Sequence, residues 1–295
     1  MGSVIKISNV QRPAQVTFNE IQWRGLACLL PKFCCAASGV RRVTGACKSE
    51  VRIGTSGWHY KHWRGPFYPS ETSPRKMFEH YVRYFDTVEL NNTFYRLPDK
   101  STMRAWRDAA PPGFRFAVKG SRFISHMKKL KDPEASIARF FDRIDVLGEK
   151  AGPVLFQLPP AWPVNIERLE TFLAALPPHY RYAFEFRHPS WSEEPGVLSA
   201  LRGHNAAFCI FDLAGYQTPL VATADFVYLR LHGPGGKYQG DYPGGVLDRW
   251  ATAIAAWSRE EKDVWIFFDN DDSGYAPKNA LELKAKVANY FSNTK

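Results

Sequence analysis

The chain has 295 residues and carries 39 Lys and Arg against 29 Asp and Glu, which gives a formal charge of +10. A hydrophobic content of 45% and a charged content of 23% are typical of a globular protein and exclude a largely disordered or fibrous chain. No apolar run reaches the roughly 18 to 20 residues that a membrane-spanning helix needs, so we expect no membrane partner.

Residues 1–50 differ in composition from the rest of the chain. They hold seven Lys and Arg against two Glu, together with four of the five cysteines. No helix or strand period runs through them, and we predict a disordered or non-native extension, with a targeting peptide or a partner-binding arm as alternatives. The cysteine spacing fits neither paired zinc ligands nor a disulfide framework, which favours a reduced, cytoplasmic protein.

Residues 51–295 alternate short strand-like runs with amphipathic segments, the pattern of repeated βα units. The eight expected strands are residues 51–56, 87–91, 114–119, 154–158, 182–187, 207–212, 227–232 and 264–270. Eight strands with helices between them predict an α/β fold in one domain, a TIM-barrel-like (β/α)8 barrel, with a doubly wound open sheet as the alternative.

The connection between the sixth and seventh strands is too short for a regular unit. Only about 14 residues separate Asp212 from Val227, and Gly215 and Pro219 lie among them. Glycine and proline disfavour the interior of a helix. We therefore predict one irregular unit at this point of the barrel.

Alternation along the strands predicts a polar barrel interior. In the seventh strand Leu229 and Leu231 lie on one face, and Arg230 and His232 lie on the other. The apolar face of a barrel strand meets the helices, so the polar face points inward. The inward charges are Arg52, Arg115, Lys119, Arg187 and Arg230 against Glu89, Glu185 and Asp212. With five cations and three carboxylates we expect an anion at the carboxyl-terminal mouth, and a salt-bridge network without a substrate is the alternative.

Residues 185–188 bring a carboxylate, a guanidinium and an imidazole together at one strand end. Glu185 could act as a general base or a metal ligand, and Arg187 could hold an anion. We expect Glu185 and His232 to share acid–base catalysis, with Asp212 orienting His232 or serving as the alternate base. Lys119, the last residue of the third expected strand, is a further catalytic candidate that also suits an anion.

Other polar and aromatic side chains lie late in the strands or in the following loops, where such barrels place chemistry. The turn at residues 54–58 offers backbone N–H groups to an oxyanion and Trp58 for stacking, although a tight turn with core aromatics explains it equally well. In the run 269–272 we favour Asn270, because the Gly and Glu that a calcium loop requires are missing. The predicted substrate-binding residues are Ser56, Trp58, Glu89, Asn91, Tyr95, His126, Gln157, Arg187, His188, Arg230 and Asn270.

The carboxylates and histidines of this set are ligands that Zn, Mn or Mg use. No HxH or HExxH pair fixes a ligand geometry, however, and five inward cations oppose a divalent ion. We therefore favour a metal-free site, with a divalent metal as the alternative, and the identity of any other cofactor stays open.

Several longer motifs occur together in the chain. They are GTSGWHYKHWRGPFYP at residues 54–69, VELNNTFYRLP at 88–98, FRFAVKGSRFISH at 114–126, VLFQLPP at 154–160, AFEFRHPSW at 183–191, YLRLHG at 228–233, and FFDND with APKNA within 267–280. In combination they resemble the YecE-like family, a domain of unknown function, over residues 51 to about 291. The resemblance implies a TIM-barrel-like fold and supplies no reaction. Two departures are Asp269, where Asn is common in the family, and the absence of the Arg that often follows Gly233.

Different classes of function fit these features. The first is a hydrolase, isomerase or lyase that acts by acid–base chemistry on a small anionic molecule such as a sugar acid or sugar phosphate. The second is a nucleic-acid-binding or phosphodiester-cleaving barrel, in which Trp58, Tyr60 and Trp63 stack on bases. Residues 51–295 carry 32 Lys and Arg against 27 Asp and Glu, a net charge of only +5, which weakens the second class. A non-catalytic ligand-binding protein is the third.

Overall fold

The structure is a computed structural model that describes residues 49–292. Its strands are β1 (Val51–Thr55), β2 (Thr87–Leu90), β3 (Arg115–Lys119), β4 (Ala151–Leu158), β5 (Tyr182–Phe186), β6 (Ala207–Leu213), β7 (Tyr216–Gln217), β8 (Phe226–Leu231) and β9 (Asp263–Phe268). The prediction for residues 1–50 concerns residues that, apart from the last two, lie outside the described ones, and it stays a prediction.

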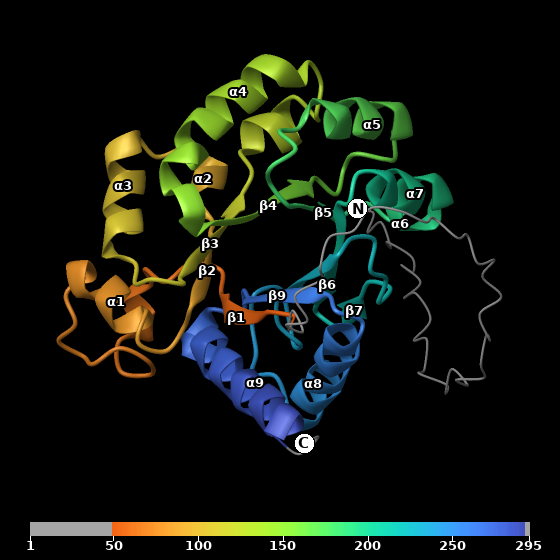
Figure 1. Ribbon diagram of the computed structural model, residues 1–295. Helices are drawn as coiled ribbons and strands as arrows, with labels where there is room; N and C mark the ends of the chain where they lie inside the picture. Colours follow the sequence, from red (N-terminus) through yellow and green to blue (C-terminus); the bar gives the residue numbers. More distant parts are fainter. Residues whose placement is uncertain (1–48, 293–295) are drawn as a thin grey trace, which may run out of the picture. The chain divides into compact units, whose positions relative to one another are not determined.

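The strands form one sheet that curves into a barrel (Figure 1). Along its hydrogen-bonded neighbours the order is β1-β9-β8-β6-β5-β4-β3-β2, and all of these neighbours run parallel. The two ends of the sheet meet where Ser56 forms a parallel bridge with Glu89. The predicted (β/α)8 barrel is therefore confirmed.

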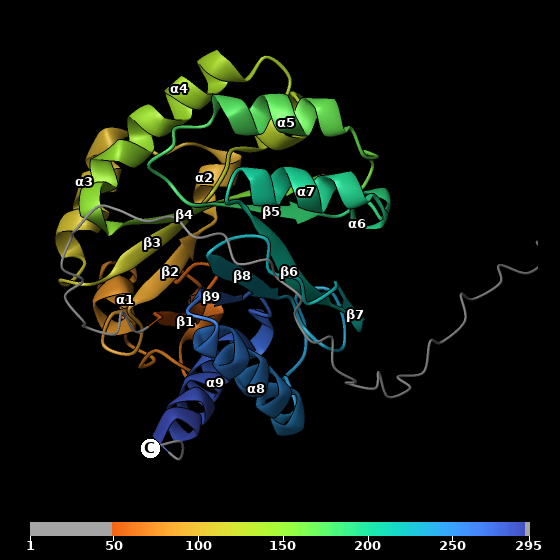
Figure 2. The same cartoon turned by 45° about the vertical axis from the view of Figure 1, so that its right-hand side comes forward.

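Helices cover the outside of the barrel (Figure 2). The longer ones are α1 (Pro74–Tyr81), α3 (Lys100–Ala109), α4 (Pro133–Ile144), α5 (Ile166–Ala175), α7 (Pro195–Gly203), α8 (Gly244–Arg259) and α9 (Tyr275–Ser292). The short ones are η1 (Lys61–Trp63), α2 (Asn92–Tyr95), η2 (Phe123–Met127), η3 (Asp145–Lys150), α6 (Ser190–Glu193) and η4 (Asp272–Gly274). Proline opens α1, α4 and α7, where the N–H that it lacks would have no partner within the helix. Among residues 49–292, no helix has the length and apolar character needed to cross a membrane.

The connection between β6 and β8 is irregular, as predicted. It contains no helix, and β7 folds back antiparallel to β6. Two threonine hydroxyls of this connection accept hydrogen bonds from the β6 backbone, Thr218 from Phe211 N at 2.9 Å and Thr223 from Phe208 N at 2.7 Å. Because buried N–H groups need partners, these hydroxyls help to hold β6 in place without a covering helix.

The barrel interior has an apolar layer beneath a polar one. The apolar layer consists of Ala117, Leu155, Ala183, Ala207, Cys209, Phe226, Tyr228, Trp265 and Phe267. Two residues further along several strands, the inward positions become polar. Arg52 belongs to the opposite end of the barrel, where it donates to Glu50 Oε2 and to Gly113 O, each at 3.0 Å. A polar interior is therefore found in the carboxyl-terminal half of the barrel, next to the mouth.

Candidate functional site

Arg230 lies at the centre of a buried group of charges inside the barrel. Its Nη2 atom is 2.7 Å from Glu89 Oε1 and 3.1 Å from Asp269 Oδ2, and its Nη1 atom is 2.8 Å from Glu185 Oε2. All four residues are buried. Charges removed from water persist when they are paired and hydrogen-bonded, and here one guanidinium binds three carboxylates. We call Arg230 and these three carboxylates the ionic cluster.

Hydrogen bonds from two hydroxyl groups complete the ionic cluster around Glu89. Ser56 Oγ donates to Glu89 Oε1 at 2.8 Å, and the Tyr228 hydroxyl donates to Glu89 Oε2 at 2.7 Å. Both carboxylate oxygens of Glu89 are therefore occupied. Ser56 follows β1 and Glu89 lies in β2, so this bond also stabilises the place where the barrel closes.

His232 connects the ionic cluster to Arg187. Its Nδ1 atom is 3.0 Å from Asp269 Oδ2, and its Nε2 atom is 2.8 Å from Arg187 Nη2. A guanidinium donates hydrogen bonds and cannot accept them, so Nε2 must be the acceptor and Nδ1 must carry the proton donated to Asp269. The sequence predicted Asp212 as the carboxylate that orients His232, and this prediction is wrong because Asp269 occupies that position.

Glu185 lies between two guanidinium groups. Arg187 Nε donates to Glu185 Oε1, and Arg230 Nη1 donates to Glu185 Oε2. Burial alone would raise the pKa of this carboxyl, but the charges of Arg187 and Arg230 outweigh burial and hold the pKa well below its usual range. Glu185 is therefore ionised at neutral pH and is a weak proton acceptor.

Lys119 ends β3 next to the ionic cluster without pairing to it. The residue is only 8% exposed, and its Nζ atom lies 4.5 Å from the centre of the Phe94 ring. Within residues 49–292, no carboxylate oxygen lies within 4.0 Å of Nζ. Burial and the charge of Arg230 lower the pKa of Lys119 to about 8, and the nearby carboxylates offset them only in part.

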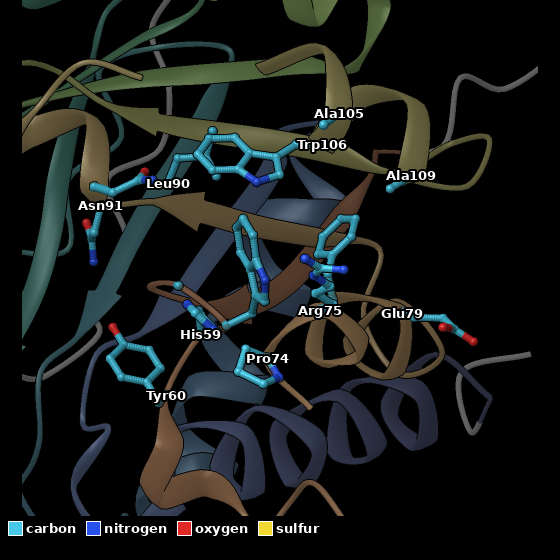
Figure 3. A pocket seen from close by; sticks show the side chains of 14 residues that line it. His59, Tyr60, Pro74, Arg75, Glu79, Leu90, Asn91, Ala105, Trp106 and Ala109 are labelled. Atoms are coloured by element: carbon cyan, nitrogen blue, oxygen red, sulfur yellow. The ribbon is translucent and has the colours of Figure 1, made fainter. Parts of the chain in front are cut away.

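A cavity of about 830 Å³ opens beside the ends of β1 and β2 (Figure 3). Trp58 and Trp106 form part of its wall, and their rings meet edge to face at 5.5 Å. Tyr60 and Asn91 line one side in this view. The Oδ1 atom of Asn91 is buried and has no hydrogen-bond partner among the described residues. The volume suits a small molecule, and Asn91 offers it an acceptor.

Comparison with known proteins identifies the family. The family described as "Protein of unknown function DUF72" matches residues 52–294. The chain belongs to the DUF72 family. The resemblance to YecE-like proteins inferred from the motifs is thereby confirmed.

Curated relatives and solved structures of the DUF72 family match most of the chain. UPF0759 protein YecE of Escherichia coli is 31% identical over 253 residues, which cover 77% of this chain and 89% of that protein. UPF0759 protein YunF of Bacillus subtilis is 24% identical over 269 residues, 79% of this chain and 93% of that protein. The crystal structure of a DUF72 family protein from Thermotoga maritima covers 81% of this chain and 99% of its own, with a TM-score of 0.74 and 29% identity.

Asp212 does not reach the ionic cluster of this DUF72 chain. In β6 the inward side chains are Cys209, in the apolar layer, and Phe211, whose ring lies 4.5 Å from the Arg187 guanidinium carbon. Asp212 is on the other face of the strand and forms a hydrogen bond with Tyr242. The predicted inward position is wrong because both faces of β6 are largely buried, and the aromatic residue takes the inner one.

Replacing Asp212 with Asn is expected to stabilise the protein above about pH 6. Burial raises the pKa of Asp212 to about 6, so the folded state binds this proton more tightly than the unfolded state does. Ionising Asp212 in the folded state lowers the free energy of unfolding. This loss is absent below the pKa of the unfolded state and grows as the pH rises through the pKa of the folded state. We expect Asp212→Asn to raise the free energy of unfolding by about 1 kcal/mol at pH 8, a figure reduced because the side chain is partly exposed, and to leave it unchanged at pH 3.

Urea unfolding at the two pH values measures this difference. The exposed Asp272→Asn is the matched control and should change stability little at either pH. An equal gain in the free energy of unfolding for Asp212→Asn at both pH values would contradict a raised pKa of Asp212 as its cause.

Asn270 also lies outside the ionic cluster. In β9 Phe267 belongs to the inner apolar layer, so the next inward position is Asp269 and not Asn270. Asn270 Nδ2 instead donates to Asn279 Oδ1 at 2.9 Å and to Gly240 O at 2.8 Å. The sequence reasoning missed Asp269, although the alternation of Trp265, Phe267 and Asp269 along the strand carried the signal.

The other predicted residues surround the mouth at different depths. His126 is half-buried, with its ring 4.9 Å from that of Phe94, and His188 Nδ1 lies 2.9 Å from Ser190 Oγ. Gln157 is half-buried in β4, whereas Tyr95 is 73% exposed. Most of the predicted set thus lies at one end of the barrel, but only part of it belongs to the ionic cluster.

The charge balance at the mouth differs from the expected one. Arg52 lies at the far end of the barrel, and Arg115 is the first residue of β3. Asp269 replaces Asp212 among the inward carboxylates. The inward charges near the mouth are therefore Lys119, Arg187 and Arg230 against Glu89, Glu185 and Asp269. The predicted excess of positive charge is wrong. Recognition of an anion would therefore depend on a hydrogen bond or ion pair with a particular side chain, and not on the net charge of the mouth.

The carboxylates of the DUF72 site are engaged by arginine. Within residues 49–292 no group of three or more His, Cys, Asp or Glu side chains is arranged to hold a metal ion. Glu89, Glu185 and Asp269 share the guanidinium of Arg230. The expectation of a metal-free site stays a prediction, which elemental analysis of the purified protein would check.

The stacking surface expected for nucleic acid does not form as predicted. Trp63 is fully buried, and its Nε1 donates to Asp271 O at 3.2 Å. Trp58 and Tyr60 are half-buried beside the cavity. Stacking on bases needs accessible ring faces, so these three residues do not provide a continuous platform.

Proposed function

We propose that this chain is an enzyme that uses acid–base chemistry on a small polar anionic molecule, such as a sugar acid or a sugar phosphate. One observation carries the proposal: Lys119 is a nearly buried amine at the mouth of a barrel, and no carboxylate within the described residues pairs with it. A buried amine without a charged partner costs stability, and such perturbed groups gather at functional sites. The mouth is also where barrels of this fold place their chemistry.

In this proposal Lys119 accepts or donates the proton, because burial and Arg230 lower its pKa to about 8, close to neutral pH. Arg187 binds the acid group of the substrate. Its bonds to Glu185 and His232 use Nε and Nη2, which leaves Nη1 for a ligand. Glu185 and His232 become positioning residues that hold Arg187, in place of the acid–base pair expected from the sequence.

The cavity beside Trp58 is the proposed binding place for the body of the substrate. Leu90 and Val118 pair across β2 and β3, and Asn91 and Lys119 are the residues that follow them. Neither Lys119 nor Arg187 lines the cavity itself, but a molecule in it that donates a hydroxyl to Asn91 would lie beside the strand end that carries Lys119. Proton transfer there is compatible with hydrolysis, isomerisation or elimination.

Binding and turnover of defined probes test the proposal. The full chain is mixed with D-gluconate, D-glucuronate or D-glucose 6-phosphate, with calorimetry for binding and proton NMR for conversion. We expect at least one probe to bind and to be converted, and we expect Lys119→Met to lower turnover by about 100-fold or more. The control is Lys76→Met, at an exposed position of α1, which should behave as wild type.

Each outcome decides between the functions. Conversion by wild type with loss in Lys119→Met supports the enzyme. Binding without conversion identifies a ligand-binding protein and contradicts the enzyme. Absence of binding for all probes, or an undiminished rate in Lys119→Met, overturns the proposal.

A further inference from the structure

Lys119 has the surroundings of a reactive amine as well as those of a proton carrier. The side chain is almost fully removed from water, with its Nζ atom over the face of the Phe94 ring, and Arg230 is the nearby cation that most disfavours its charge. Its backbone is fixed at the strand end, since the Thr93 hydroxyl donates to Lys119 O at 2.6 Å. Removal from water and a neighbouring cation are the two features that activate a lysine as a nucleophile, and here they outweigh the Phe94 ring face, which favours the ammonium.

We propose that Lys119 forms an imine with the carbonyl carbon of a small oxo acid. The substrate class of the site is then an aldehyde or ketone that also carries a carboxylate or phosphate. This inference rests on the proposed function and adds a covalent step to it.

The state of the amine supports attack on a carbonyl. Only the uncharged amine has a lone pair to donate, and at neutral pH an ordinary lysine is uncharged in about one molecule in three thousand. With the pKa lowered to about 8 by burial and by Arg230, the uncharged share at pH 7 rises to about one in ten. Arginine cannot take this role, because the guanidinium does not lose its proton in proteins.

The proposed step balances without any further reagent. The amine nitrogen bonds to the carbonyl carbon as the C=O π bond breaks. The nitrogen loses a proton, and the oxygen gains one to give a carbinolamine. Loss of that oxygen as water then leaves the C=N bond, so that one amine and one carbonyl yield one imine and one water.

His126 is suited to carry the protons of this step. It follows β3 on η2, and its ring stands edge to face against Phe94, the same ring that Lys119 contacts. Burial and the charge of Lys119 lower the pKa of His126, so its imidazole is mostly uncharged at neutral pH and can accept a proton. Ser125 Oγ lies 3.0 Å from Nδ1 and helps to orient the ring.

Reductive trapping tests the inference. The full chain is incubated with glyoxylate, a small anionic aldehyde, and sodium cyanoborohydride, which reduces an imine to a stable amine. We expect peptide mass spectrometry to find the adduct on Lys119 at a rate at least about tenfold above that of exposed lysines such as Lys76. Labelling of Lys119 should reach half its maximum near pH 8, where its amine loses the proton.

Two variants make the result specific. Lys119→Arg keeps the charge and cannot form an imine, so the selective adduct should vanish while the thermal unfolding midpoint stays close to that of wild type. His126→Gln should slow labelling of Lys119 without moving the adduct to another residue. Equal labelling of exposed lysines, or an unmodified Lys119 in folded wild type, overturns the imine.

Failure of the imine can be told apart from failure of the proposed function. If wild type converts a sugar acid or sugar phosphate and Lys119→Met does not, while trapping finds no adduct on Lys119, the acid–base enzyme stands and the covalent step falls. If neither conversion nor trapping depends on Lys119, both proposals fall.

Discussion

Arg230→Met is expected to destabilise the protein by about 3–5 kcal/mol at pH 7, or to prevent folding altogether. The substitution removes the single cation that contacts Glu89, Glu185 and Asp269, all of them buried. It leaves three carboxylates close together in a low dielectric, with only Arg187 and His232 as remaining partners for two of them. Urea unfolding and the thermal midpoint measure the loss, which for a domain of this size corresponds to roughly 10 °C.

The pH dependence of the loss distinguishes charge repulsion from lost packing. Although burial opposes it, pairing with Arg230 holds the pKa of Glu185 and of Asp269 below the usual range. Depressed pKa values of this kind contribute stability that is present above the unfolded pKa and is lost as the pH falls through the folded pKa. The difference between wild type and Arg230→Met should therefore shrink as the pH falls below about 4.

Two further variants complete this test. Arg230→Lys keeps one positive charge, but an ammonium group cannot reach three carboxylates as the guanidinium does, so we expect an intermediate loss. Arg104→Met, at an exposed position of α3, should change stability by no more than about 0.5 kcal/mol. A destabilisation by Arg230→Met that is the same at pH 7 and at pH 2 would show that the charge of the ionic cluster is not its cause.

Gly54→Ala is expected to destabilise the protein by about 1–3 kcal/mol because it forces two strands of the barrel apart. A Cβ atom on Gly54 would lie 2.5 Å from Thr87 O and 3.1 Å from Thr87 Cγ2. Thr87 begins β2, and β1 and β2 are joined by a single bridge between Ser56 and Glu89. The backbone oxygen cannot move aside without disturbing this closure, so both the strand contact and the Ser56 bond to Glu89 should weaken.

Gly203→Ala is the matched control for this prediction. Gly203 is the last residue of α7, and a Cβ atom there meets no other atom within 4 Å. Alanine in a helix is more stable than glycine by roughly 0.5–1 kcal/mol, so this variant should be unchanged or slightly stabilised. If Gly54→Ala and wild type are equally stable in urea unfolding, β1 and β2 can move apart without a loss of folding free energy, and the prediction is wrong.

Much of the fold could be predicted because its causes are local. Period-two runs of apolar residues separated by amphipathic segments reflect the pleat of strands and the turn of helices, and the eight expected strands lie within a few residues of the observed ones. Gly215 and Pro219 disfavour a helix between β6 and β8, and none forms there. The strand order follows from parallel strands joined by outer helices.

The candidate site could be predicted only in part. Lys119, Glu185, Arg230 and His232 were expected on the inner face and are found there, because each alternates with large apolar neighbours that pack against the helices. Which group would serve as partner to which could not be read from the chain. The carboxylate on His232 is Asp269, which follows β9 and is 37 positions away, and Glu89 comes from β2, 141 positions before Arg230.

The sequence by itself determined the barrel class, the number of its strands and the end at which polar side chains gather, since these depend on periodicity within each segment. Only the tertiary structure decided that Asp269 and not Asp212 faces inward. It also decided that Arg230 pairs with three carboxylates, whereas Lys119 pairs with no carboxylate of the described residues. The physical reason is that both faces of these strands are buried. Alternation therefore shows which residues share a face, but not which of the two faces points into the barrel. The pairing of buried charges then depends on which distant side chains the closed barrel brings within hydrogen-bond distance.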